Sequence, residues 1–224
     1  MARLVPSLGH LPPPRGFGPI RLDRFSPNFV EAEVRGFVNV RPLPPYRHIY
    51  PLPEAALANL AYYFDHDDRE PRDVAGYTAP LVRALERWRR EASRSELVSE
   101  PAGDRLLVWD LRPGARDALV TLQGPERALY EACDAAADAR TLARAAGCDG
   151  PEAVHDALGP LVDQGLMVRD GSRYLALALS LSEYALPAWA GQRRRELALD
   201  RGRPALREIV PPTVEGNEVV PPIT

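Results

Sequence analysis

The chain has 224 residues, a formal net charge of −3, 45% hydrophobic residues and 26% charged residues. This length allows one or two domains with a buried core, and the composition excludes a wholly disordered chain. No run of 18 apolar residues occurs and the first residues do not resemble a signal peptide, so we expect a cytoplasmic protein without a membrane partner. The slight negative charge also argues against a general binder of polyanions.

Proline marks the organisation of the chain, because its 24 prolines are about twice the usual share of ~5%. Eleven of them lie in residues 1–53. We therefore expect this segment to be an extended arm, with a short helix over residues 1–11 and one strand around residues 20–25. Residues 28–53 are expected to be irregular, because proline disrupts both helices and central strands.

A pair of helices is expected over residues 54–94. Leu57, Leu60, Ala61 and Phe64 follow the spacing of one helix face, which predicts a helix over residues 54–65. A second apolar stripe predicts another helix over residues 76–92.

The segment 95–180 has a different pattern. Three short strands are predicted, followed by three helices that begin at Gly124, after Thr141 as the N-cap, and at Pro151. Asp170-Gly171 then predicts a two-stranded hairpin. We expect an α+β fold in which this segment is a winged helix-turn-helix preceded by a small β-sheet. The remaining residues, 181–224, are expected to form a helix over 183–199 and a proline-rich tail.

A winged helix often binds DNA through its third helix, which would span residues 150–165 here. That stretch contains Glu152, Asp156 and Asp163 but no arginine. Because phosphate contacts require cations, we expect no nucleic-acid partner, and DNA binding is kept only as an alternative.

The small sheet suggests peptide binding instead. An extended peptide adds a strand to a free sheet edge, and pockets beside that edge select its side chains. The two walls of such a groove are predicted to be the strand at residues 117–122 and the third helix. The candidate peptide-binding residues are Ala118, Leu119, Val120, Thr121 and Leu122 on the strand and Val154, His155, Leu158 and Leu161 on the helix. The alternative is that the chain's own hairpin or tail covers this edge.

Other chemistry has weaker signals. Residues 65–68, Asp-His-Asp-Asp, are interpreted as a solvated turn, so no metal ligand and no catalytic residue are predicted. Cys133 is expected in the core and Cys148 nearer the surface. The run Arg193–Arg195 is interpreted as a solvated helix face, with an anionic partner as the alternative.

Several stretches of the sequence carry a resemblance. The most specific is residues 21–27, Arg-Leu-Asp-Arg-Phe-Ser-Pro; the others are His10-Leu11-Pro12-Pro13, Val40-Arg41-Pro42 and Leu60-Ala61-Tyr62-Tyr63-Phe64-Asp65. Together they resemble the C-terminal part of a known family, the RiPP (bacteriocin) maturation radical SAM protein 1 enzymes. Residues 122–130 and 161–179 fit the same region, and this segment also looks like the PqqD-like leader-recognition module.

The resemblance implies a cobalamin-binding domain, then a radical SAM partial barrel, then this region. Residues 1–27 would be the last helix and strand of the barrel, with Arg21, Asp23 and Phe25 facing the reaction cavity. The family's cofactors are an iron–sulfur cluster, S-adenosylmethionine and cobalamin. This chain lacks the family's C-x-x-x-C-x-x-C motif, so we expect none of these cofactors in it and no catalysis by it alone.

The resemblance therefore implies a piece that binds and positions the precursor (leader) peptide. Its other expected partner is a separate radical SAM and cobalamin chain. Two alternatives remain open, a winged-helix regulator that binds DNA and a non-functional truncated fragment of the enzyme.

Overall fold

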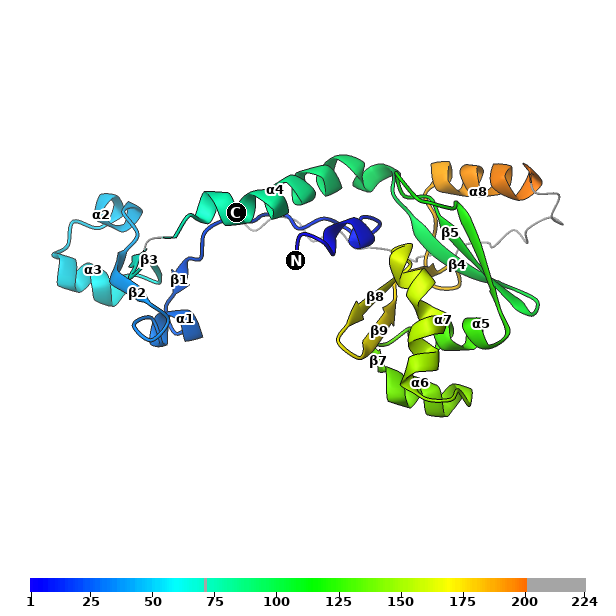
Figure 1. The fold of residues 1–224 in the computed structure, drawn as a ribbon. Helices are drawn as coiled ribbons and strands as arrows, with labels where there is room; N and C mark the ends of the chain where they lie inside the picture. The colour runs from blue at the N-terminus through cyan, green and yellow to red at the C-terminus, as the bar shows by residue number, and fades with distance from the viewer. Residues whose placement is uncertain (71, 201–224) are drawn as a thin grey trace. The chain divides into compact units, whose positions relative to one another are not determined.

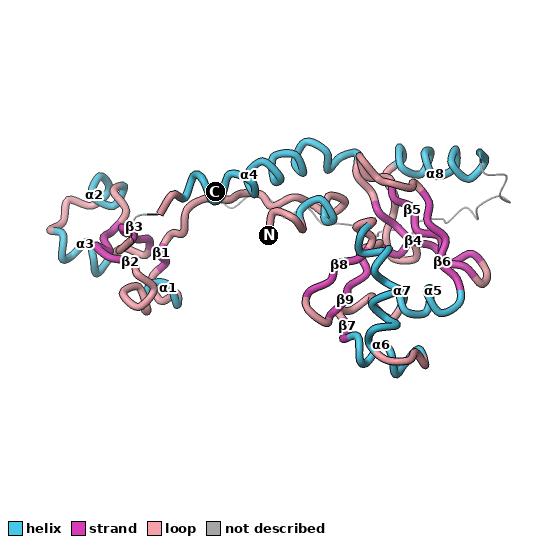
Figure 2. Tube along the Cα trace, in the orientation of Figure 1, coloured by secondary structure: helices cyan, strands magenta, loops and turns pink. Residues whose placement is uncertain are grey.

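The computed structural model describes residues 1–70 and 72–200, and it confirms the α+β class (Figures 1 and 2). Within these residues there are eight α-helices and three small open sheets. The chain divides into two compact units. Unit 1 joins Met1–Pro13 to the chain from Leu81 onward, and unit 2 is Pro14–Pro80. None of the described helices has the length and apolar character needed to span a membrane.

Unit 2 is built on a three-stranded antiparallel sheet with the order β1-β3-β2. Its core contains Leu22, Phe37 and Phe64. The division from unit 1 falls within α4. The elements of this unit are β1 (Leu22–Asp23), α1 (Pro27–Val30), β2 (Phe37–Pro42), α2 (Pro45–Ile49), α3 (Glu54–Leu60), β3 (Tyr63–Asp68) and the first part of α4 (Val74–Glu91).

The structure corrects three expectations in this unit. Residues 28–53 are not irregular, because they contain β2 and two short helices; Pro42 is tolerated as the last residue of an edge strand. The helix expected over residues 54–65 ends at Leu60, since Tyr63 begins a strand that pairs on both sides. The strand expected around residues 20–25 has only two residues and ends before Phe25, which has a φ of 68°.

Unit 1 contains a four-stranded sheet with the order β10-β4-β5-β6. Strands β4, β5 and β6 are antiparallel neighbours, whereas β10 pairs with β4 in parallel. β6 is therefore a terminal strand of this sheet. The strands are β4 (Leu97–Ala102), β5 (Arg105–Asp110), β6 (Leu119–Gln123) and β10 (Leu179–Ser180).

Three helices and a hairpin follow β6, as expected, and β7 joins the hairpin in a small antiparallel sheet of order β7-β9-β8. Asp138 rather than Thr141 caps α6, because its carboxylate accepts from the N–H of Arg140. Gly165 ends α7 with a φ of +70° in a Schellman motif, in which Leu166 N donates to the Leu161 carbonyl oxygen. The elements are α5 (Gly124–Glu131), β7 (Ala137–Asp138), α6 (Ala139–Ala146), α7 (Pro151–Asp163), β8 (Met167–Asp170) and β9 (Arg173–Ala176).

The four-stranded sheet is covered on both faces, as Figure 1 shows. Helices α5–α7 pack on one face through an apolar cluster that includes Leu106, Val108 and Leu122. Helix α8 (Ala188–Asp200) covers the other face, where Leu107 and Trp109 are buried. This last helix begins after Pro187 rather than at Glu183, and the tail expected after it lies outside the described residues.

The α8 face also buries charge. Arg194 Nη1 lies 2.6 Å from Glu100 Oε2, and both side chains are less than a tenth exposed. Trp109 Nε1 donates to the other oxygen of Glu100 at 2.9 Å. The run Arg193–Arg195 is therefore not a uniformly solvated face, because its central residue binds a carboxylate beneath the helix.

The N-terminal segment of unit 1 is also anchored to the core. Only Val5–Leu8, a short 3₁₀ helix, is helical within the segment expected to be a helix over residues 1–11. His10 Nε2 hydrogen-bonds the Leu177 carbonyl oxygen at 2.8 Å. Trp88 Nε1, from α4, donates to the carbonyl oxygen of Leu11 at 2.8 Å.

Candidate functional site

The outer edge of β6 is the first candidate site. Asp110 N donates to the Ala118 carbonyl oxygen directly opposite it, at 3.2 Å. Because backbone direction alternates in an antiparallel pair, the N–H and C=O groups of Leu119 and Gln123 are directed away from β5. No strand of the described residues pairs with this edge.

The side chains of β6 mostly serve the protein's own core. Leu122 is fully buried among the helices, and Leu119 is buried on the α8 face. Val120 packs partly buried against the helix-side cluster. Ala118 and Thr121 are half-buried. A peptide at this edge would therefore meet backbone groups more than apolar side chains.

The apolar wall expected on α7 is not exposed. Val154, Leu158 and Leu161 are 0–2% exposed and belong to the same buried cluster as Leu122. In this structure they are core residues, and a ligand has no access to their side chains. The packing of α5 on β5 and β6, and of α7 on α5, explains why this face of α7 is covered.

His155 lies on another side of α7. Its Nδ1 hydrogen-bonds the hydroxyl of Tyr174 on β9, and the centroids of the two rings are 5.6 Å apart. Burial raises the pKa of Tyr174. The structure therefore assigns His155 to the contact between α7 and the hairpin, and does not bring it together with the edge of β6.

The exposed face of α7 is acidic. Glu152, Asp156 and Asp163 are all exposed on this helix, which carries no arginine. The hairpin has Arg169 and Arg173 beside Asp170, so its charge is mixed. Together these charges are unfavourable for a helix that would enter the groove of a polyanion.

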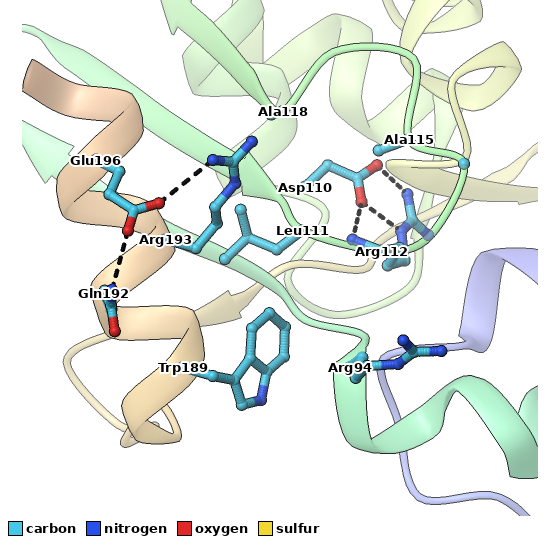
Figure 3. A pocket seen from close by; sticks show the side chains of 11 residues that line it. Arg94, Asp110, Leu111, Arg112, Ala115, Ala118, Trp189, Gln192, Arg193 and Glu196 are labelled. Atoms are coloured by element: carbon cyan, nitrogen blue, oxygen red, sulfur yellow. Dashed lines mark hydrogen bonds and ion pairs between the residues drawn. The ribbon is translucent and has the colours of Figure 1, made fainter. Parts of the chain in front are cut away.

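A pocket of about 590 Å³ is the second candidate site (Figure 3). We call it the Trp189 pocket. It lies where the ends of β5 and β6 meet α8 and the 3₁₀ helix Ala92–Arg94. Its lining residues are Arg94, Asp110, Leu111, Arg112, Gly114, Ala115, Ala118, Trp189, Gln192, Arg193 and Glu196.

An internally paired group forms one wall of this pocket. Arg112 binds Asp110 with two hydrogen bonds, Nε to Oδ1 at 2.7 Å and Nη2 to Oδ2 at 2.6 Å. Its Nη1 also donates to the carbonyl oxygens of Ser7 and Gly165 at 2.9 and 3.0 Å. The guanidinium and the carboxylate are both nearly buried. This pair therefore ties three distant segments together and is already satisfied.

Sequence reasoning missed this pocket. Its residues come from three segments that lie far apart in the chain, and none of them forms a recognisable motif. The available signal was Asp110 and Arg112, which lie two residues apart at the end of an apolar strand. Such spacing indicates a charged pair at a sheet end but does not reveal what packs against it.

Arg21, Asp23 and Phe25 lie at the surface of unit 2. Arg21 Nε binds Asp23 Oδ1 at 2.8 Å, and the Arg21 guanidinium lies 3.9 Å from the centre of the Tyr63 ring. Phe25 is 79% exposed. Arg21 and Asp23 are thus brought together, whereas Phe25 extends from a left-handed turn residue and shares no strand face with them.

The acidic run at residues 65–68 is part of β3 rather than a turn. Arg41 binds Asp65 at 3.1 Å and Asp67 at 3.0 Å from the neighbouring strand. The described residues contain no group of three or more potential ligands placed to hold a metal ion.

The two cysteines do not fit an iron–sulfur cluster. Cys133 is buried in the apolar core, as expected, and burial raises the pKa of its thiol to about 11. A cluster requires several thiolates, and this thiol is held protonated in apolar surroundings. Cys148 is half-buried and is not bonded to Cys133.

Comparison of the chain with protein-family models, with curated proteins and with solved structures finds no significant match.

Proposed function

We propose that this chain is a peptide-binding module whose β6 edge holds an extended segment of a precursor (leader) peptide. It would act within a RiPP maturation system, and the catalytic radical SAM and cobalamin chemistry would belong to a separate chain. The resemblance of residues 21–27 and 122–130 to that family is the reason for choosing this class of peptide.

The order of elements supports a winged-helix assignment for the segment from α5 to β9. It runs helix, strand, helix, helix and hairpin, and its three strands form one antiparallel sheet of order β7-β9-β8. The antiparallel strands β4–β6 precede it. A sheet followed by such a segment supports the proposal of a leader-recognition module.

The observation that carries the proposal is the position of β6. Both faces of its sheet are covered by helices, and β10 covers the far edge of β4. The terminal strands of this sheet are β6, with five residues, and β10, with two, so β6 offers the longer edge for strand addition. Backbone hydrogen bonds would supply most of the affinity, because Val154, Leu158 and Leu161 are buried and contribute no contact.

The acidic solvent face of α7 favours peptide over DNA as the ligand. Binding to DNA would release counterions, so its affinity would fall steeply with added salt. A titration with double-stranded DNA that shows tight, salt-sensitive binding would therefore favour the regulator alternative over this proposal.

The test is a selection of random linear peptides, about 12 residues long so that they exceed a strand of about 5–6 residues, against the full chain. We expect a convergent set with Kd below about 100 µM, which corresponds to roughly −5.5 kcal/mol. In a selected peptide, N-methylation of successive residues should weaken binding at every second position, because only alternate amides face β6.

Two results would contradict the proposal. One is a selection that enriches no peptide. The other is an N-methyl scan without a period of two, which would mean that the peptide is not held as a strand. If binders are found, their motif should recur in small open reading frames beside the gene, which tests the precursor as the source.

A further inference from the structure

The sheet face beneath α8 buries two carboxyl groups and one guanidinium. Glu96 and Glu100 are each 6% exposed. The side chain of Tyr184, which packs in the apolar cluster under this helix, contacts Glu96. Trp109 of the same cluster contacts Glu100. Arg194 binds Glu100 at 2.6 Å, so the charge of Glu100 is balanced, whereas Glu96 has no ion pair with any residue that the structure describes.

Glu96 also lacks hydrogen bonds. The hydroxyl of Tyr184 donates to its Oε1 at 3.2 Å. Its Oε2 is buried and has no partner in the described part of the chain. An ionised carboxylate can accept several hydrogen bonds, and burying one without a cation and with a single donor is unfavourable.

The other charged groups around this face are paired with one another or exposed. The paired groups are Arg193 with Glu196 on α8, Arg112 with Asp110 at the end of β5, and Arg105 with Asp104 at its start. The exposed groups are Arg94 in the 3₁₀ helix, Glu183 beside Tyr184, and Arg195 on α8. Strands β6 and β10 carry no charged residue. Tyr184 is therefore the titratable group that contacts Glu96.

Protonation of Glu96 removes most of this unfavourable burial, because a neutral carboxyl group is far less costly to bury than an ionised one. Burial raises the pKa of Glu96, and the hydrogen bond from Tyr184 offsets part of that effect. The native chain therefore binds this proton at a higher pH than the unfolded chain, whose glutamates titrate near about pH 4.3. The unfavourable contribution is complete at high pH and disappears as the pH falls from the native pKa towards about 4.3.

The charge on Glu96 acts on the connection that leads into α8 (Figure 1). Tyr184 lies between β10 and α8, and Leu181 and Leu186 from the same connection pack in the cluster beneath the helix. An ionised Glu96 opposes the packing of this connection on the sheet. Arg194 holds the helix itself through Glu100.

We infer that Glu96 is a pH-sensitive switch in the attachment of α8, which packs more firmly on the sheet when this carboxyl group is protonated than when it is ionised. Acidification holds Trp189 and the other α8 residues of its pocket in place, and a rise in pH loosens them. The inference rests on the α8 face alone and is independent of the proposed peptide binding.

Amide hydrogen exchange measures the release of α8, because the amides of a helix exchange when it opens. The full chain is compared as wild type, Glu96→Gln and Glu183→Gln at pH 7.5 and pH 4.5, with each rate divided by the intrinsic rate of that amide. Comparing variants at one pH cancels the other groups that titrate in this range. Glu183→Gln is the matched control, since it removes an exposed charge next to Tyr184.

At pH 7.5 we expect the amides of α8 to exchange about tenfold more slowly in Glu96→Gln than in the wild type, because no unpaired charge is buried in the variant. At pH 4.5 the difference should fall to about twofold, since most of the wild type then carries the proton. Glu183→Gln should match the wild type at both pH values.

A carbon-13 NMR titration of the Glu96 carboxyl group gives a second readout. Its midpoint should lie above that of Glu183, and Tyr184→Phe should raise it further, because the donor to the ionised form is lost. Equal midpoints for Glu96 and Glu183 would overturn the inference. So would α8 exchange in Glu96→Gln that equals the wild type at pH 7.5, or a difference that persists unchanged at pH 4.5.

Discussion

The face of the four-stranded sheet beneath α5–α7 is packed by apolar side chains, whereas the α8 face also buries two carboxylates and a guanidinium. On the first face Val154, Leu158 and Leu122 are fully buried in one cluster. On the second, Glu100 binds Arg194, and Glu96 accepts from the hydroxyl of Tyr184 at 3.2 Å.

The difference concerns what fixes each helix in place. An apolar face accepts many packings of similar volume, whereas a buried ion pair is stable only when both partners meet. We therefore expect the position of α8 over the sheet to depend on the ion pair between Arg194 and Glu100. The same helix supplies Trp189 and Arg193 to the pocket, so its position matters for the site.

The largest effect is expected on the α8 face. Replacing Arg194→Met leaves Glu100 buried without its cationic partner, which costs roughly 3–5 kcal/mol of unfolding free energy. Urea denaturation at neutral pH measures this loss.

A double variant, Glu100→Leu with Arg194→Met, sharpens that prediction. Replacing both charges by apolar groups should recover part of the lost stability, since no unpaired charge remains, while the buried Trp109 Nε1, which loses its acceptor, still costs roughly 1–3 kcal/mol. A single Arg194→Met variant as stable as the wild type would show that the ion pair does not hold α8.

On the sheet face covered by α5–α7, Leu158→Ala should lower the free energy of unfolding by roughly 3 kcal/mol, because it creates a cavity in a fully packed cluster. Asp156→Ala on the exposed side of the same helix is the control and should change stability by less than about 0.5 kcal/mol. Equal effects of the two substitutions would mean that α7 is not oriented as described.

Acid should lower the free energy of unfolding by protonating His10. Burial, together with the charge of Arg112, lowers the pKa of this imidazole to about 4. The unfolded chain binds this proton near pH 6.5, so the contribution is complete above that pH and is lost as the pH falls from about 6.5 to about 4.

We expect the wild type to lose about 2–3 kcal/mol more than His10→Gln over this interval, when unfolding is followed in urea at each pH. The difference between the two proteins isolates the imidazole from the carboxylates that titrate in the same range. Parallel pH curves would contradict a buried neutral His10.

The smallest effect is expected at the start of α6. Asp138→Ala removes the cap on Arg140 N and the contact from the Ser172 hydroxyl to Asp138 Oδ2 at 2.5 Å, at a cost of about 1 kcal/mol. Thr141→Ala lies inside the helix without this role and should cost clearly less in the same denaturation assay.

The buried face of α7 could be predicted from the sequence because its signals are local. The spacing of Val154, Leu158 and Leu161 and the stop at Gly165 both follow from one helix. The same spacing was misleading for the site, because an apolar stripe identifies a buried face without saying whether the chain itself or a ligand buries it.

Contacts between residues far apart in the sequence explain the remaining differences between the predictions and the structure. Tyr63–Asp68 has the composition of a helix end followed by a turn, and becomes a strand only because β1 and β2 lie on either side of it. Arg194 belongs to a run of three arginines, and only contact with Glu100, 94 positions away, distinguishes it from its neighbours. Neither relation has a local signal.

The most direct test of the central claim is amide hydrogen exchange with and without a selected peptide bound to the full chain. Strand addition at β6 predicts slower exchange at the backbone amides of Leu119 and Gln123, which face away from β5, and little change on the exposed face of α7. Protection confined to α7 or to the hairpin β8–β9, with the amides of β6 unchanged, would contradict the account.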